Sequence, residues 1–202
     1  MSTDSIEFWY EFASPYSWIA AERIERLANE AGGIEVRWRP FVIGPILRRR
    51  PGNPSPTQDA PPAQKAYRRR DVERICASEG LPLDWPSTYP RNGLLAARTA
   101  LALDDGPRRD FSVAVFRANF EMDREISDPA VVTGILEALG IAASTTMAKA
   151  LSGENKSRLA AAVDEAIGKG IFGAPSFVVG DEMFWGNDRL EQAIEWARAP
   201  GA

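Results

Sequence analysis

The pattern of apolar and polar residues predicts β-strands in both terminal segments of the chain. Near the N-terminus, "IEFWYEF" (residues 6–12) is a nearly continuous apolar run, and "IEVRWRPF" (34–41) alternates apolar with charged residues. Near the C-terminus, "SFVVG" (176–180) and "EMFW" (182–185) are short apolar runs separated by a turn. Runs of this length and alternation are typical of strands. We therefore expect four strands, two at each end.

The residues between these strands follow a helical period. The first helix is expected from about Pro15 to Ala31 and ends at two glycines, Gly32 and Gly33. Residues 44–63 are so rich in proline that we expect no regular structure there. The remaining expected helices cover about 62–78, 92–103, 107–122, 129–139, 143–151, a segment ending near 168, and 187–199.

This order of elements predicts an α/β protein with a thioredoxin-like fold and an inserted all-helical domain. A strand-helix-strand unit opens the chain, and a helix-strand-strand-helix unit closes it. We place the N-terminal part of the thioredoxin-like domain at residues 1–44, the helical insertion at 45–152 and the C-terminal part at 153–202.

Composition narrows the classes of function. The 202 residues carry a net charge of -4, which argues against a nucleic-acid partner because such proteins usually present a basic surface. The arginine runs at 48–50 and 68–70 are interpreted as solvated faces, with an anion site as the alternative. No apolar run approaches the roughly 20 residues that span a bilayer. We expect a cytoplasmic protein without a membrane partner.

Histidine is absent and cysteine occurs once, which removes several kinds of catalytic site. Without an imidazole there is no Ser/His/Asp triad and no histidine-based metal site, so we predict no metal. The single thiol, Cys76, follows a helical pattern with Val72 and Ile75 and is expected in the core. "GKGIFG" (168–173) has dinucleotide-loop spacing but lies after a helix and before a strand, the reverse of the required order.

The stretch "SPYS" (14–17) lies where the first strand gives way to the first helix. Thioredoxin-like proteins carry Cys-Pro-x-Cys at this place, whereas this chain has Ser14 and Ser17. Neither serine supports thiol redox chemistry, which excludes a disulfide oxidoreductase. Taken alone, Ser14 before Pro15 is typical of a helix N-cap.

Two longer motifs carry a resemblance to a known family. "FASPYSW" near the start and "GIFGAPSFVVGDEMFWGNDRL" near the end flank the helical insertion. In this order they resemble the 2-hydroxychromene-2-carboxylate isomerase family, a glutathione-dependent branch of the DsbA-like superfamily related to kappa-class glutathione transferases. The resemblance implies a DsbA-like or kappa-class-like fold, reduced glutathione as cofactor, a homodimer and a role in aromatic catabolism.

The resemblance also implies which residues bind glutathione. Ser14 would donate a hydrogen bond to the glutathione thiolate at the helix N-terminus. Ala174 and a cis-configured Pro175 would hold the cysteinyl backbone, and the further expected contacts are Asn53, Asn187 and Asp188. Each has a structural alternative: a helix cap for Ser14, Asn187 and Asp188, and a strand-start proline for Pro175.

The implied reaction converts 2-hydroxychromene-2-carboxylate, or a similar cyclic acid, to trans-o-hydroxybenzylidenepyruvate by reversible thiolate addition. Tyr16 could pack or line the substrate pocket, and Ser17 is interpreted as structural. Arg48 to Arg50 and Arg91 are candidates for contact with the substrate carboxylate, with none of them singled out. Candidate aromatic walls, with burial in the core as the alternative, are Trp9, Tyr10, Trp38, Tyr89 and Trp185. A kappa-like transferase that forms stable conjugates and a non-catalytic peptide-binding module stay open.

Overall fold

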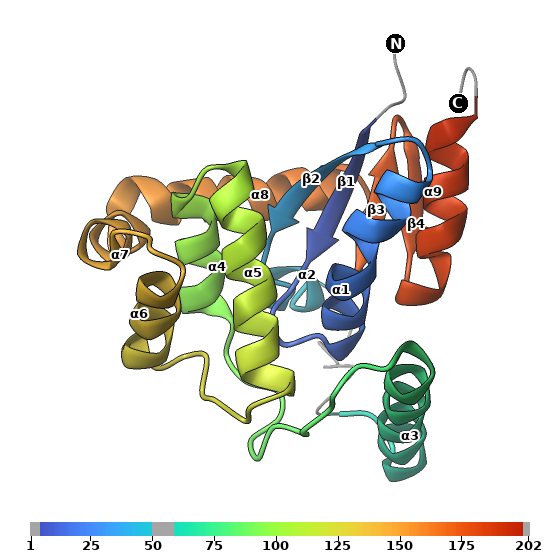
Figure 1. The fold of residues 1–202 in the computed structure, drawn as a ribbon, viewed down its shortest axis with the longest axis horizontal. Helices are drawn as coiled ribbons and strands as arrows, with labels where there is room; N and C mark the ends of the chain where they lie inside the picture. Colours follow the sequence, from blue (N-terminus) through green and yellow to red (C-terminus); the bar gives the residue numbers. More distant parts are fainter. Residues whose placement is uncertain (1–4, 50–58, 200–202) are drawn as a thin grey trace.

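Four strands form one mixed sheet in the computed structural model, which describes residues 5–49 and 59–199 (Figure 1). The strand order is β2-β1-β3-β4, with β1 parallel to β2 and antiparallel to β3, and β3 antiparallel to β4. All four predicted strands are present: β1 (Ser5–Tyr10), β2 (Glu35–Pro40), β3 (Ser176–Val179) and β4 (Glu182–Trp185). The two ends of the chain therefore meet in one thioredoxin-like sheet, as predicted.

Strand β1 lies in the middle of the sheet and is buried on both faces. Phe8 and Tyr10 point into the larger hydrophobic cluster, whereas Trp9 points into a smaller one with Phe41. A strand covered on both sides needs apolar residues at consecutive positions, which explains the adjacent apolar residues at 8–10. A short turn connects the C-terminal end of this strand to Ser14.

Helices cover both faces of the sheet and form a block beside it (Figure 1). Helices α1 and α9 pack on the face that holds Phe8, and α8 packs on the face that holds Trp9. Helices α4 to α7 pack on one another, and α3 stands below the N-terminal end of α1. The bounds are α1 Pro15–Glu30, α3 Pro62–Glu79, α4 Leu94–Ala102, α5 Asp105–Phe120, α6 Pro129–Ala138, α7 Ala143–Leu151, α8 Gly153–Gly168 and α9 Leu190–Arg198.

One helix contradicts the expectation of an irregular segment over residues 44–63. Helix α2 (Gly44–Leu47) begins that segment, with Pro45 in its first turn. Proline is tolerated there because the first N–H groups of a helix have no intrahelical partner. Prolines therefore exclude a helix interior but not a helix start.

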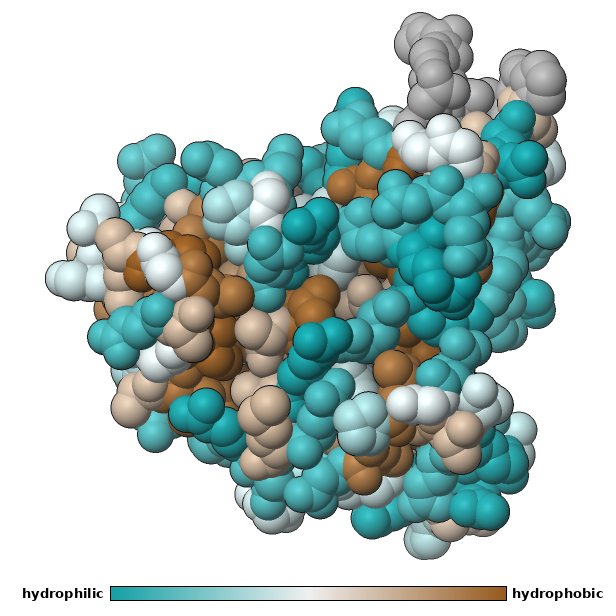
Figure 2. All heavy atoms as spheres, in the orientation of Figure 1, coloured by the Kyte–Doolittle hydropathy of each residue, from teal (hydrophilic) through white to brown (hydrophobic). Residues whose placement is uncertain are grey.

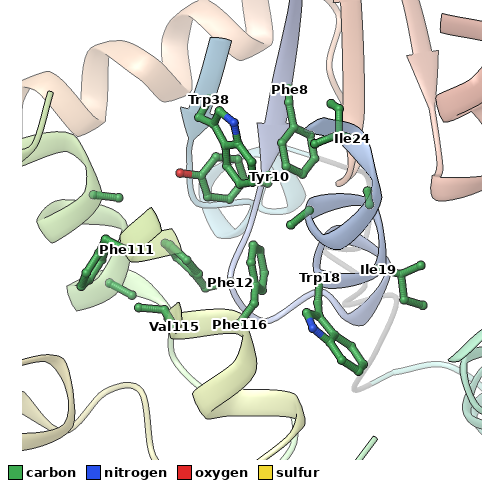
Figure 3. Packing of buried hydrophobic residues seen from close by; sticks show 14 of the residues in the cluster. Phe8, Tyr10, Phe12, Trp18, Ile19, Ile24, Trp38, Phe111, Val115 and Phe116 are labelled. Carbon is green, nitrogen blue, oxygen red and sulfur yellow. The ribbon is translucent and has the colours of Figure 1, made fainter. Parts of the chain in front are cut away.

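Helix α5 fastens the helical insertion to β1 through polar contacts as well as apolar ones. The Tyr10 hydroxyl and the Ser112 hydroxyl lie 2.7 Å apart, and Asn119 Nδ2 donates to the Phe12 carbonyl at 3.1 Å. Figure 3 shows Phe116 from α5 among Tyr10 and Phe12, with ring centroids 5.8 and 5.0 Å apart respectively. The strand end that precedes Ser14 is thereby held by the insertion.

Three of the five candidate pocket walls lie in this core and not at a pocket. Trp9, Tyr10 and Trp38 are fully or almost fully buried, and burial raises the pKa of the Tyr10 phenol. Their positions on β1 and β2 face packed helices, so the structural alternative is the correct one for these residues. Tyr89 and Trp185 are 40% and 52% exposed.

The surface is mostly charged and polar (Figure 2). Apolar surface shows over α6 and α7, and in the region between α3 and the helices above it. Among the helices that the structure describes, none combines the length and apolarity needed to cross a bilayer.

Candidate functional site

Ser14 links the first helix to the loop that precedes β3. It is the N-cap of α1, and its Oγ accepts a hydrogen bond from the Ser17 N–H at 3.2 Å. The same hydroxyl donates to the carbonyl oxygen of Ala174 at 3.1 Å. Ser14 therefore caps the helix as its sequence context predicts, and its proton points to the cis-proline loop.

The Ala174–Pro175 peptide bond is cis, as predicted. Pro175 is buried, and its carbonyl accepts from the Gly186 N–H at 3.0 Å. Ala174 is half-buried beside Ser14. The loop thus lies between the start of α1 on one side and the start of the last helical segment on the other.

Asn187 and Asp188 begin a 3-10 turn (Asn187–Arg189) that runs into α9, but their side chains differ in environment. Asn187 is buried, and its Oδ1 accepts from Arg23 Nη1 at 3.1 Å. The Asp188 side chain is 73% exposed and lies 3.5 Å from Arg189. Asp188 therefore presents its carboxylate to solvent, whereas Asn187 ties the turn to α1.

Gly186 shapes the approach to this turn. Its φ angle of 110° is one that residues with a side chain rarely adopt. A Cβ there would also collide with the Asp188 carboxylate. The glycine thus lets the chain turn from β4 toward Asp188 while its N–H holds Pro175.

Two further expected residues are placed as follows. Ser17 is fully buried, and its Oγ accepts from the Glu11 N–H at 3.5 Å, in line with a structural role. Asn53 lies outside the described residues.

The sequence reading missed Glu11, which forms the turn that carries Ser14. The Ser14 N–H donates to the Glu11 carbonyl at 3.0 Å. Burial raises the pKa of the Glu11 carboxyl to about 7, against a lowering effect of the Ala13 N–H. Glu11 directly follows a strand that is buried on both faces, and this position in the sequence could have indicated that its carboxyl is partly buried.

Arg91 is not placed to bind a substrate carboxylate. Its side chain is 2% exposed, and its guanidinium donates to Asn119 Oδ1 at 3.2 Å and to the Arg124 carbonyl at 2.9 Å. Asp123 pairs with it, and Glu125 lies 3.4 Å away. Arg91 therefore holds the insertion together.

The other candidate arginines lie on the surface. Arg48 and Arg49 are exposed, and Arg49 lies 3.6 Å from Asp164 on α8.

Tyr16 and Trp185 contact different segments around the candidate site. The Tyr16 hydroxyl donates to Asp71 Oδ2 on α3 at 2.8 Å. The Trp185 ring lies 4.8 Å from that of Phe172 and covers Gly173, where a Cβ would collide with the indole. Tyr16 thus ties the first turn of α1 to α3, whereas the half-exposed Trp185 packs over the loop that precedes β3.

A thioredoxin-like sheet with a helical insertion, a cis-proline and serines at the positions of the redox cysteines defines a DsbA-like protein without the Cys-Pro-x-Cys motif. The chain belongs to the DSBA-like thioredoxin domain family, whose model matches residues 5–195. The resemblance that the sequence motifs indicate, to 2-hydroxychromene-2-carboxylate isomerases of the DsbA-like superfamily, is confirmed by this match and by the isomerases to which the chain is similar.

Three known proteins illustrate the similarity. The chain is 27% identical to 2-hydroxychromene-2-carboxylate isomerase of Sphingobium xenophagum, over 94% of this chain and 95% of the relative. It is 25% identical to human glutathione S-transferase kappa 1, over 93% of this chain and 88% of the relative. A solved structure of 2-hydroxychromene-2-carboxylate isomerase superposes with a TM-score of 0.84 at 26% identity, covering 95% of this chain and 93% of that one.

Proposed function

We propose that the protein is a glutathione-dependent isomerase that converts 2-hydroxychromene-2-carboxylate, or a similar cyclic hemiketal or enone acid, to its open-chain trans form. The observation that carries this proposal is the hydrogen bond from Ser14 Oγ to the Ala174 carbonyl at 3.1 Å. It puts a hydroxyl donor, and no thiol, where a thioredoxin-like protein carries its reactive cysteine. The named isomerase relatives support the same reaction.

The residues around Ser14 suit the chemistry of a glutathione molecule. Its extended cysteinyl part would pair with the Ala174 backbone as an added strand does. The exposed Asp188 carboxylate suits the free amine, and the N–H groups of the Asn187–Arg189 turn suit the γ-glutamyl carboxylate. Asn53 is proposed as a further contact to the tripeptide backbone.

Bound glutathione would supply a thiolate that adds to the conjugated carbon and leaves again after rotation about the former double bond. In the complex, the Ser14 hydroxyl would donate its hydrogen bond to that sulfur in place of the Ala174 carbonyl. The positive end of the α1 helix dipole favours negative charge at the same place. Lowering a thiol pKa of about 8.5 by one unit raises the thiolate fraction at pH 7 from roughly 3% to roughly a quarter.

Two measurements test the proposal. Reduced glutathione at about 100 times its dissociation constant should stabilise the protein by roughly 2.7 kcal/mol, which a thermal shift detects. The cyclic acid incubated with protein and glutathione should then yield the open-chain isomer with no net consumption of glutathione. The absence of any shift at millimolar glutathione would end the enzymatic proposals and leave the non-catalytic peptide-binding module.

A kappa-like glutathione transferase is the second candidate, supported by the similarity to the human kappa enzyme. The two activities differ in the fate of the sulfur. A transferase product keeps the carbon–sulfur bond and consumes glutathione, whereas an isomerase product does not. Mass spectrometry of the product therefore separates them.

A further inference from the structure

Arg23, in the middle of α1, binds the turn at which the last helical segment begins. Its side chain is 11% exposed, and its Nη1 donates to Asn187 Oδ1 at 3.1 Å. Asn187 is 5% exposed and directly follows Gly186, whose N–H donates to the carbonyl of Pro175 in the cis-proline loop. The Arg23 guanidinium therefore reaches, through one hydrogen bond, the turn that would bind the γ-glutamyl end of glutathione.

This hydrogen bond determines which way the Asn187 amide faces. A guanidinium has only donors, so the amide must present its oxygen, and not its nitrogen, to Arg23. The NH2 group of the amide is consequently turned away from Arg23. A carboxylate needs donors, because its oxygens only accept hydrogen bonds. With Arg23 in place, Asn187 thus has its donor available for a carboxylate and its acceptor already bound.

The guanidinium of Arg23 is fully engaged within the protein. Its Nη2 pairs with Glu191 on α9, and its Nε lies 3.2 Å from Glu79, the last residue of α3. A planar guanidinium can serve three partners at once because its nitrogens point in different directions. Since this one cation already faces two carboxylates, it is poorly suited to bind a further anion directly. Its contact with Asn187 leaves a role in positioning that amide.

We propose that Arg23 is a positioning residue for the cofactor: it orients the Asn187 amide so that the NH2 group donates to the α-carboxylate of the γ-glutamyl group. This inference rests on the proposed function. Arg23 also neutralises Glu79 and Glu191, which would otherwise repel that carboxylate. The consequence is a preference for thiols that carry an intact γ-glutamyl α-carboxylate.

A glutathione analogue that lacks only this carboxylate, γ-aminobutyryl-cysteinylglycine, tests the proposal apart from turnover. Titration calorimetry on the full chain would give the affinities for glutathione and for the analogue, and their ratio measures the preference for the carboxylate. We expect this ratio to fall by about tenfold in Arg23→Met and in Asn187→Asp, because each variant loses a positioned donor to a charged group. Asp at position 187 still accepts from Arg23 but has no NH2 group.

Arg26→Met is the matched control. Arg26 lies on the same helix, and its ion pair with Glu30 at 3.0 Å is exposed, so this variant should keep the wild-type ratio. Arg23→Lys is the second test of the position, should Arg23→Met fail to fold, because it keeps a positive charge for Glu79 and Glu191. Its single ammonium cannot replace three separate nitrogens, so the ratio should fall here as well.

The ratio separates positioning of the amide from a merely structural role, which would weaken both ligands equally. An unchanged ratio in Asn187→Asp, or in a folded Arg23→Met or Arg23→Lys protein, would overturn the inference even if isomerisation is observed. Equal affinities of wild type for the two ligands would overturn it too. A ratio that depends on Arg23 and Asn187, without any isomerisation, would keep the inference and reject the isomerase. If wild type binds neither ligand, the inference and the proposed function are both wrong.

Discussion

Ser14 Oγ and the carbonyl oxygen of Ala174 lie 3.1 Å apart, although the two residues are 160 positions apart in the chain. The pairing of β1 with β3 brings them together, because Ser14 follows one strand and Ala174 precedes the other. The hydroxyl also caps α1 through the Ser17 N–H. One side chain thus serves helix stability and the candidate chemistry, and the two roles predict different results when it is removed.

Ser14→Ala should reduce isomerisation by about ten- to a hundredfold near neutral pH. Loss of a hydrogen bond to a charged sulfur costs roughly 1.5 to 3 kcal/mol, beyond the about 1 kcal/mol of stability that any lost cap costs. The activity difference should shrink at high pH, where glutathione ionises without help. The ultraviolet absorbance of the thiolate, titrated in the binary complex, measures the effect directly.

Ser152→Ala is the matched control for that variant. Ser152 caps α8 with the same geometry, accepting from the Asn155 N–H at 3.1 Å. It should lose a similar stability and keep its turnover per folded molecule. If Ser14→Ala behaves like Ser152→Ala, with matching thiolate titration midpoints, Ser14 is only a cap and the helix N-terminus stabilises the thiolate.

Asp188→Asn should weaken glutathione binding without loss of stability. The carboxylate is 73% exposed, so its replacement removes a charge partner for the γ-glutamyl amine and little packing. We expect roughly three- to tenfold weaker affinity by titration calorimetry. Asp181→Asn, in the exposed turn between β3 and β4, is the control and should bind as wild type does. Equal affinities for all three proteins would remove Asp188 from the cofactor site.

Most of the fold could be predicted because its signals are local. The apolar periods of the strands and helices, and the glycines and prolines between them, gave each main element to within a few residues. Cys76 was correctly expected in the core, because its helical spacing with Val72 places it on the inward face of α3. The cis configuration of Pro175 followed from the family resemblance.

The parts that could not be predicted depend on contacts between distant segments. Arg23 reaches Asn187 across the α1–α9 contact, and nothing near either residue in the sequence indicates the pair. From the sequence, Arg91 was a reasonable candidate for binding the substrate carboxylate. In the structure it is buried and bound by Asn119 and Asp123. A sequence does not distinguish a buried arginine from an exposed one when both precede a helix.

Arg91→Ala should destabilise the protein by about 3 kcal/mol while turnover per folded molecule is kept. Removing a guanidinium with a 2% exposed side chain leaves buried carbonyls and an amide without their donor. Chemical denaturation followed by tryptophan fluorescence measures the change. Arg109→Ala is the control, because that side chain is 44% exposed and should cost less than about 1 kcal/mol. A stable Arg91→Ala protein with a selective rise in substrate KM would restore Arg91 to the substrate site.

Oxidised glutathione should form no mixed disulfide with the native protein. Burial, followed by the nearby charge of Glu121, raises the pKa of the Cys76 thiol to about 11, so little thiolate exists near neutral pH. Ser14→Cys should instead form the adduct, because the new thiol stands at the redox position at the start of α1. Intact-mass spectrometry after incubation distinguishes the two proteins. A glutathione adduct on native wild type would contradict the burial of Cys76.

The last prediction concerns the pH dependence of stability that Glu11 imposes. Burial raises its pKa from 4.5 to about 7 in the folded protein, so the folded state holds this proton over a range in which the unfolded chain has lost it. The stabilisation is therefore complete below about pH 4.5, declines as the pH rises and is gone above about pH 7.

Glu11→Gln removes this titration while keeping the shape of the side chain. The free energy of unfolding of wild type, relative to Glu11→Gln, should fall between pH 4.5 and about 7 and stay constant above that. Because the residue is half-buried, we expect a change on the order of 1 kcal/mol. Urea denaturation at a series of pH values measures it, with Glu182→Gln on the exposed strand β4 as the control. If the free energy of unfolding of wild type relative to Glu11→Gln rises with pH instead, the fold stabilises the Glu11 carboxylate. The turn that carries Ser14 would then hold a negative charge at neutral pH.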